Sequence, residues 1–81
     1  MTVRVVAFGR VRELLGVGER GLSVEPNACV ADAWAALTAE VVALQDAAPT
    51  TRVARNGIIA AWDEPLHEGD ELALLPPVGG G

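Results

Sequence analysis

Residues 30–46, VADAWAALTAEVVALQD, contain the pattern that decides the fold. Their apolar positions recur at i, i+3, i+4, i+7, i+11 and i+14, which is the spacing of one face of an α-helix. The members of this stripe are Val30, Ala33, Trp34, Leu37, Val41 and Leu44. Asp32 lies in the first turn, where an acidic side chain favours the helix dipole, and Pro49 follows the last turn. The pattern predicts a single main helix from Val30 to about Asp46, with Trp34 in the core.

Alternating apolar runs on both sides of this helix predict strands. Residues 2–8 alternate between two faces, one with Val3, Val5 and Ala7 and the other with Arg4, Val6 and Phe8. We expect a short helical segment at 11–15, ended by Gly16, and further strands at 21–25, 51–55, 58–62 and 71–75. Asn56-Gly57 is a strong signal for a tight hairpin between two of these strands. In the last strand, Leu72 and Leu74 share one face, and Ala73 and Leu75 share the other.

This order of elements predicts an α+β fold in which a mixed sheet wraps one main helix, the β-grasp or ubiquitin-like arrangement. We expect a domain at residues 1–75 and an extended, flexible C-terminal tail at 76–81. A single helix covers one face of such a sheet, so apolar residues on the open face are candidates for docking a partner. The residues expected there are Val6, Phe8 and Leu75.

Composition narrows the function classes. The chain has 81 residues and a net charge of −5, which argues against nucleic acid as a partner. No stretch is long and apolar enough to span a membrane, and no leader pattern is present, so we expect a cytoplasmic protein. All six basic residues are arginine. A chain without lysine cannot receive a copy of itself through an isopeptide bond to a side chain.

The side chains inside the domain suggest no catalytic or metal site. Cys29 is alone, and we expect it to be a small buried residue and a weak cap at the helix entrance. His67 has no second ligand at metal spacing and is expected on the surface. Asp63 and Glu64 are adjacent in a turn before Pro65 and are expected to be solvated. We therefore expect no metal and no bound cofactor.

The end of the sequence, Leu75-Pro76-Pro77-Val78-Gly79-Gly80-Gly81, suggests a different kind of site. Glycine has no Cβ, so a glycine tail fits a channel too narrow for other residues. The two prolines fix φ and favour extended geometry, which projects the tail outward. Six residues reach roughly 20 Å when extended. The alternative is an ordinary frayed terminus, but the strand and diproline just before the glycines argue against it.

Several segments, in this order, resemble the small subunit of molybdopterin synthase from end to end. They are Phe8-Gly9-Arg10-Val11-Arg12-Glu13-Leu14-Leu15-Gly16, Asn56-Gly57, Glu64-Pro65-Leu66, Gly69-Asp70-Glu71-Leu72 and the Pro-Pro-Val ending with its glycines. The ending is the most specific of these motifs. Two features depart from the family pattern: Gly79 makes the ending a triple glycine, and Cys29 replaces the threonine common at the helix entrance.

The resemblance implies a sulfur carrier for molybdenum cofactor biosynthesis, which is not an enzyme on its own. Gly81 would be adenylated by a ubiquitin-activating-like enzyme with ATP, passing through a transient AMP ester, and then converted to a thiocarboxylate. The tail residues Gly80, Gly79, Val78, Pro77 and Pro76 would thread into the large catalytic subunit, with Leu75 in the docking surface. There the sulfur would reach cyclic pyranopterin monophosphate.

Three alternatives remain open from the sequence. One is a sulfur carrier for thiamine or another thio-cofactor, which shares the fold and the Gly-Gly ending; the Pro-Pro-Val lead-in and the length favour the molybdopterin role. Another is a ubiquitin-like modifier joined to target lysines. The third is an interaction module whose tail has no chemical role.

Overall fold

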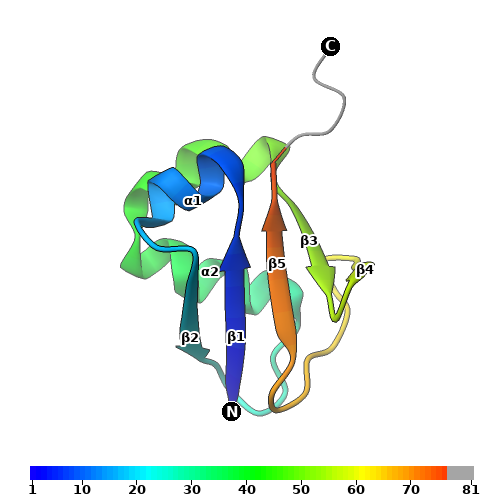
Figure 1. Cartoon of the computed structure of the whole chain (residues 1–81). Helices are drawn as coiled ribbons and strands as arrows, with labels where there is room; N and C mark the ends of the chain where they lie inside the picture. Colours follow the sequence, from blue (N-terminus) through cyan, green and yellow to red (C-terminus); the bar gives the residue numbers. More distant parts are fainter. Residues whose placement is uncertain (77–81) are drawn as a thin grey trace.

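The fold was analysed in a computed structural model, which describes residues 1–76. Its elements follow the chain in this order: β1 (Thr2–Ala7), α1 (Gly9–Leu15), β2 (Glu19–Ser23), α2 (Val30–Glu40), the 3₁₀ helix η1 (Val42–Thr50), β3 (Arg52–Arg55), β4 (Ile58–Ile59) and β5 (Glu71–Leu75). The strands form one mixed sheet in the order β2-β1-β5-β3-β4, and the helices lie on one side of it (Figure 1). This is the predicted β-grasp arrangement. The predicted tail residues 77–81 lie outside the described part.

The two central strands come from opposite ends of the sequence. β1 and β5 pair in parallel, with Val5 opposite Leu72 and Ala7 opposite Leu74. β2 and β3 pair antiparallel to them on either side, and β4 closes the edge through the hairpin. Asn56 and Gly57 both have positive φ, 51° and 87°, as a tight two-residue hairpin turn requires. The predicted hairpin is therefore confirmed.

The main helix is shorter than predicted, ending at Glu40 rather than near Asp46. Val41 leaves the helical region, with φ −123° and ψ 84°, and the chain continues as η1. Two consecutive β-branched residues, Val41 and Val42, have low helix propensity, and no basic side chain lies in the last turn of α2. The apolar stripe nevertheless remains inside, because the change of helix type keeps Leu44 fully buried.

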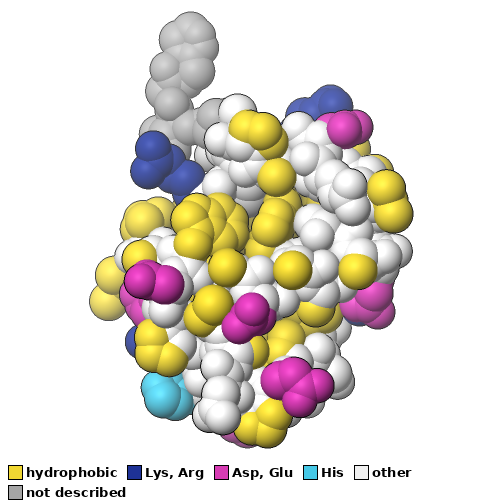
Figure 2. Space-filling model, turned by 180° about the vertical axis from the view of Figure 1, so that it is seen from behind, with side chains coloured by type: hydrophobic (Ala, Val, Ile, Leu, Met, Phe, Trp, Pro, Cys, Tyr) yellow, Lys and Arg dark blue, Asp and Glu magenta, His cyan; other side chains and the backbone are white. Residues whose placement is uncertain are grey.

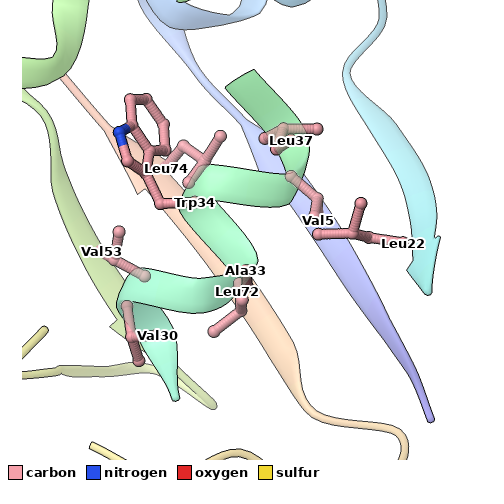
Figure 3. Close-up of a pocket in the computed structure, with 9 residues that line it drawn as sticks. All are labelled: Val5, Leu22, Val30, Ala33, Trp34, Leu37, Val53, Leu72 and Leu74. Carbon is pink, nitrogen blue, oxygen red and sulfur yellow. The ribbon is translucent and has the colours of Figure 1, made fainter. Parts of the chain in front are cut away.

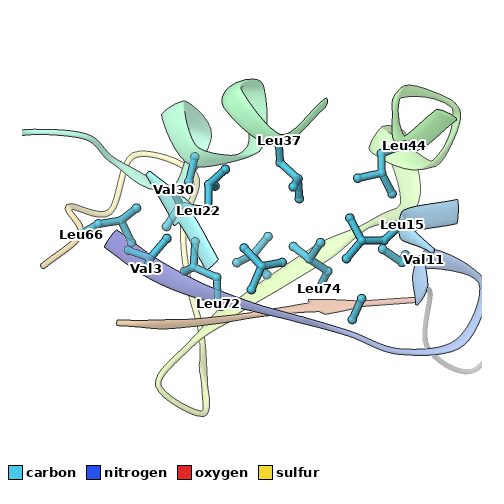
Figure 4. Close-up of a cluster of buried hydrophobic side chains, with 14 residues drawn as sticks. Val3, Val11, Leu15, Leu22, Val30, Leu37, Leu44, Leu66, Leu72 and Leu74 are labelled. Carbon is cyan, nitrogen blue, oxygen red and sulfur yellow. The ribbon is translucent and has the colours of Figure 1, made fainter. Parts of the chain in front are cut away.

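The core fills the space between the helices and the inner face of the sheet (Figure 4). Its members are Val3, Val5, Ala7, Val11, Leu15, Leu22, Val30, Ala33, Leu37, Leu44, Val53, Leu66, Leu72 and Leu74. Between α2 and the sheet this packing leaves a void of about 10 Å³ (Figure 3). An apolar void of that size has room for about one water molecule, so it cannot hold a cofactor.

The strand predicted over residues 58–62 ends early, because the chain leaves the sheet to meet the start of α2. The first backbone N–H groups of a helix lack partners within the helix. Here Val30 N–H donates to the Glu64 carbonyl at 2.9 Å, and Ala31 N–H donates to the Trp62 carbonyl at 2.7 Å. Trp62 is 41% exposed in this loop, and its ring meets the ring of the half-buried Trp34 edge to face, with 6.1 Å between the ring centroids. Trp34 packs against the core, as predicted.

None of the helices among residues 1–76 has the length and apolar character needed to cross a membrane.

Candidate functional site

The root of the tail lies where the two central strands end. Because β1 and β5 run parallel, both reach the same edge of the sheet, and the chain leaves β5 there at Pro76 (Figure 1). The first residue of α1, Gly9, lies beside this proline. A Cβ on Gly9 would be 3.3 Å from Pro76 Cγ, and Gly9 has a positive φ of 55°. Glycine therefore allows the backbone before α1 to turn tightly against the root of the tail.

The sheet face opposite the helices carries an apolar row that crosses four strands. Val6 of β1 pairs with Ala73 of β5, Ala73 pairs with Ala54 of β3, and Ala54 pairs with Ile59 of β4. Side chains of directly paired residues lie on the same face of a sheet. Ile59 is 56% exposed at the edge of this row. We call Val6, Ala73, Ala54 and Ile59 the apolar row.

Two further apolar residues continue this face toward the tail. Phe8 keeps extended backbone (φ −132°, ψ 158°), so it continues the alternation of β1 and lies on the side of Val6. Its side chain is 48% exposed. Leu75 is half-buried and paired with the exposed Arg52. The structure therefore places all three residues predicted for docking, Val6, Phe8 and Leu75, on the open face beside the tail root.

The sequence analysis missed the remaining members of the row, Ala73, Ala54 and Ile59. Their face could be read from alternation, and the Asn56-Gly57 turn sets Ala54 opposite Ile59. What alternation alone does not give is the order of the strands. Only the parallel pairing of β1 with β5 brings Val6 beside Ala73.

A charged group closes the open face on the side away from the tail. Arg4 of β1 donates a short hydrogen bond to Glu71 of β5, and its Nη1 lies 3.4 Å from Glu19 Oε1. The hydrogen bond to Glu71 and the charge of Glu19 raise the pKa of the Arg4 guanidinium. These side chains are exposed, so solvent screens the attraction and the group adds little stability. It limits the apolar surface to the half of the sheet that adjoins the tail.

A second polar cluster lies at the opposite end of the sheet from the tail. Arg55 Nε donates to Glu64 at 2.7 Å, and Arg55 Nη1 donates to Asp70 at 3.1 Å. Asp70 also accepts hydrogen bonds from the Asn56 side chain at 2.9 Å and from His67 N–H at 2.8 Å. We call Arg55, Asn56, Glu64 and Asp70 the hairpin cluster. It ties the β3–β4 hairpin to the turn before β5.

The hairpin cluster corrects the expectation that Glu64 is simply solvated, since Glu64 is half-buried and ion-paired, whereas Asp63 is exposed as expected. Asp70 is 7% exposed. Burial acts to raise the pKa of Asp70, but the hydrogen bonds from Asn56, His67 and Arg55 outweigh it and lower the pKa below 3.8. Every acceptor of this carboxylate is used to hold the chain together, which identifies a structural role.

The helix entrance is better capped than predicted. Cys29 is the N-cap residue of α2 and is half-buried rather than buried. Its N–H donates to Asp32 Oδ2 at 2.9 Å, and this hydrogen bond lowers the pKa of Asp32. The pair forms a capping box, so the acidic side chain compensates for the poor capping ability of cysteine.

Residues 1–76 contain no group of three or more His, Cys, Asp and Glu side chains arranged to hold a metal ion. His67 is exposed, as predicted. The predicted tail residues Gly81, Gly80, Gly79, Val78 and Pro77 lie outside the described residues, so their roles remain predictions. What the described residues provide is an apolar row, in which Ala54 is buried and Ile59 is exposed, beside the root of the tail.

Comparisons with known proteins agree with this arrangement. The family model described as "ThiS family" matches residues 5–81. The molybdopterin synthase sulfur carrier subunit of Escherichia coli K12 is 33% identical, over 98% of this chain and 99% of that protein. The crystal structure of SAMP1, small archaeal modifier protein 1, from Haloferax volcanii is 34% identical and has a TM-score of 0.91, with 100% of both chains covered.

A third similar structure contains a partner. It is the complex of subunits 1 and 2 of molybdopterin-converting factor from Helicobacter pylori 26695. The matched chain is 28% identical and has a TM-score of 0.71, with 100% of both chains covered. Similarity along the full length therefore extends to proteins described as a sulfur carrier, as a modifier and as part of a two-subunit complex.

Proposed function

This chain belongs to the ThiS family, and from that premise we propose that it is the sulfur carrier subunit of a molybdopterin synthase. The observation that carries the proposal is the place of the glycine ending. In a chain similar along its full length to a sulfur carrier subunit, only Pro76, Pro77 and Val78 separate it from β5, a central strand of the open apolar face.

The proposed chemistry uses only the carboxylate of Gly81. A carboxylate is a poor electrophile, because oxide would have to leave. One carboxylate oxygen therefore attacks the α-phosphorus of ATP in an adenylating enzyme, which releases pyrophosphate and leaves an acyl-adenylate. Hydrosulfide from the sulfur source then attacks the acyl carbon, the bond from that carbon to the phosphate oxygen breaks, and AMP departs. Loss of the sulfur-bound proton leaves Gly81 as a thiocarboxylate.

The second half of the reaction takes place on the large subunit. The tail residues Pro76, Pro77, Val78, Gly79 and Gly80 thread a narrow channel, and the thiocarboxylate sulfur attacks a carbon of cyclic pyranopterin monophosphate and displaces an oxygen substituent from it. Water then cleaves the acyl–sulfur bond, which leaves the sulfur on the pterin and returns Gly81 as a carboxylate. Acid–base and electrostatic catalysis come from the large subunit, because the carrier brings no catalytic side chain. No cofactor is held by the carrier itself, and the reaction takes place in the cytoplasm.

The body of the carrier has the role of docking. The apolar row, Phe8 and Leu75 are the surface through which we expect the large subunit to bind. Burial of apolar area gives the affinity, and the nearby tail root sets where the chain enters the partner. Support comes from the similarity to the Helicobacter pylori two-subunit complex.

An intact-mass experiment tests the proposal. The chain is incubated with a ubiquitin-activating-like enzyme, ATP and a sulfur donor, and we expect replacement of one oxygen by sulfur at Gly81. The same incubation without ATP serves as the control. The absence of this mass change, with an enzyme that adenylates another carrier normally, would contradict the proposal.

A second candidate function is protein modification, because of the similarity to SAMP1 of Haloferax volcanii. In that case Gly81 would end as an amide on a lysine of a target protein. Peptide mass spectrometry of cell extracts separates the two: a modifier leaves remnants of the glycine ending on target lysines, whereas a carrier is recovered as free thiocarboxylate. Since the chain has no lysine, chains of the modifier linked to itself are not expected.

A further inference from the structure

The six arginines of the chain divide into two groups. Three form ion pairs: Arg4 with Glu19 and Glu71, Arg20 with Glu40, and Arg55 with Glu64 and Asp70. The other three, Arg10, Arg12 and Arg52, are exposed and form no ion pair with any residue among 1–76. We call these three the arginine collar.

All three collar residues lie at the end of the molecule from which the tail leaves. Arg10 follows Gly9, which abuts Pro76. Arg12 lies two residues further along α1, and Arg52 begins β3 directly opposite Leu75. In Figure 2, one basic group lies at the upper left of the molecule and another at the upper right, beside an acidic side chain.

A structural reason accounts for the position of only one of these three arginines. Arg10 lies in the first turn of α1, where a positive charge opposes the helix dipole. Arg52 is exposed on a strand and has no acidic partner in the described part of the chain. Only Arg12 has a structural explanation, since it lies in the last turn of α1 and favours the dipole there. At least two of the three charges therefore have no role within the domain.

Because of the collar, charged side chains are unevenly distributed over the molecule. The tail end, formed by α1, η1 and the start of β3, has three arginines and two acidic residues, Glu13 and Asp46. The chain has 6 basic and 11 acidic residues, which leaves three arginines and nine acidic residues for the rest. Within residues 1–76, the elements at the tail root thus carry three arginines against two acidic side chains, whereas acidic side chains are in large excess in the rest.

We propose that the arginine collar binds carboxylates on the protein surface around the mouth of the channel that receives the tail, and steers the carrier tail first into its partner. This rests on the proposed function and names the chemistry of the partner's surface. Five residues follow Pro76 and reach about 16 Å when extended. The collar therefore meets the rim of the channel, whereas ATP or pterin phosphates lie at its far end.

The test measures association with the large subunit of molybdopterin synthase from the same organism. The probe is the double variant Arg10→Gln and Arg52→Gln, which leaves Arg12 and its helix contact in place. At about 50 mM salt we expect the association rate constant to fall about tenfold, and at about 500 mM salt to match wild type. Arg10→Lys with Arg52→Lys, which keeps both charges, should restore most of the rate.

The matched control is Arg4→Gln with Arg20→Gln, which also removes two positive charges, but at positions away from the tail root. It should associate within about twofold of wild type. Equal association of the Arg10→Gln, Arg52→Gln variant and wild type at low salt would overturn the inference, as would a loss of rate that is just as large at about 500 mM salt. Either result leaves the proposed function standing, whereas failure of wild type to bind at any salt counts against both.

Discussion

The two ends of the sheet use arginine in opposite ways. At the hairpin end, Arg55 is held between Glu64 and Asp70 and fixes β3 and β4 against the turn before β5. At the tail end, Arg10 and Arg52 are exposed and have no acidic partner among the described residues. The ion pairs at the hairpin end stabilise the fold, whereas the exposed arginines at the tail end have the contact role that we propose. Changes at the two ends should therefore be separable, one affecting stability and the other affecting function.

The largest effect is expected at the tail. Deletion of Gly80 and Gly81 should abolish sulfur transfer completely, because it removes the group that is adenylated. The free energy of unfolding should stay at the wild-type value, since the core lies within residues 3–74. Thiocarboxylate mass and urea unfolding measure the two quantities. Residual transfer by the truncated chain would show that another group carries sulfur.

The next effect concerns the open face. Ala73→Asp places a charge in the middle of the apolar row and should weaken binding to the large subunit about 100-fold. Ala61→Asp adds the same charge at an exposed loop position outside the row and is the matched control. Titration calorimetry gives the affinities, and circular dichroism checks that both variants fold. Equal affinities would show that this face is not the docking surface.

At the hairpin end the expected loss is of stability. Asp70→Ala leaves the Asn56 amide and His67 N–H without their acceptor, which should cost about 1–3 kcal/mol. Asp63→Ala, in the neighbouring exposed turn, should leave stability unchanged. At saturating partner, sulfur transfer by folded Asp70→Ala should match wild type. A loss of transfer without a loss of stability would reverse the roles assigned to the two ends.

The smallest effect is a change in acid stability. The folded-state pKa of Asp70 is lowered, so its contribution is present above the unfolded value of 3.8 and is lost as the pH falls through the folded value. Wild-type stability should therefore decline below about pH 4, and Asp70→Asn should flatten that decline. Thermal unfolding between pH 2 and pH 7 measures it. An unchanged acid limb in the variant would assign the decline to other carboxylates.

Local patterns predicted much of this molecule. Alternation in residues 2–8 and 71–75 gave the correct inner and outer faces, and Asn56-Gly57 gave the hairpin. These features depend on neighbours in the chain, which a sequence displays directly. The docking residues Val6, Phe8 and Leu75 were placed on the open face for the same reason; their role in binding stays a prediction.

Features that depend on distant partners were missed. The prediction that Glu64 is solvated was wrong because its partner, Arg55, lies in β3, whereas Glu64 lies in the loop after β4. The end of α2 at Glu40 was missed because the stripe continues through η1 with nearly the same spacing. The early end of β4 was missed because the loop after β4 supplies the Trp62 and Glu64 carbonyls that accept hydrogen bonds from the first N–H groups of α2. No local pattern records such pairings.

The parallel pairing of β1 with β5 has a consequence for how the protein is made. Val6 is synthesised long before Ala73 and Leu75, so the open apolar face cannot form until β5 has also been made. Contacts between residues so far apart in sequence also form slowly during folding. A nascent chain that has not yet reached Leu75, or one truncated before it, thus has no complete face to offer the proposed partner.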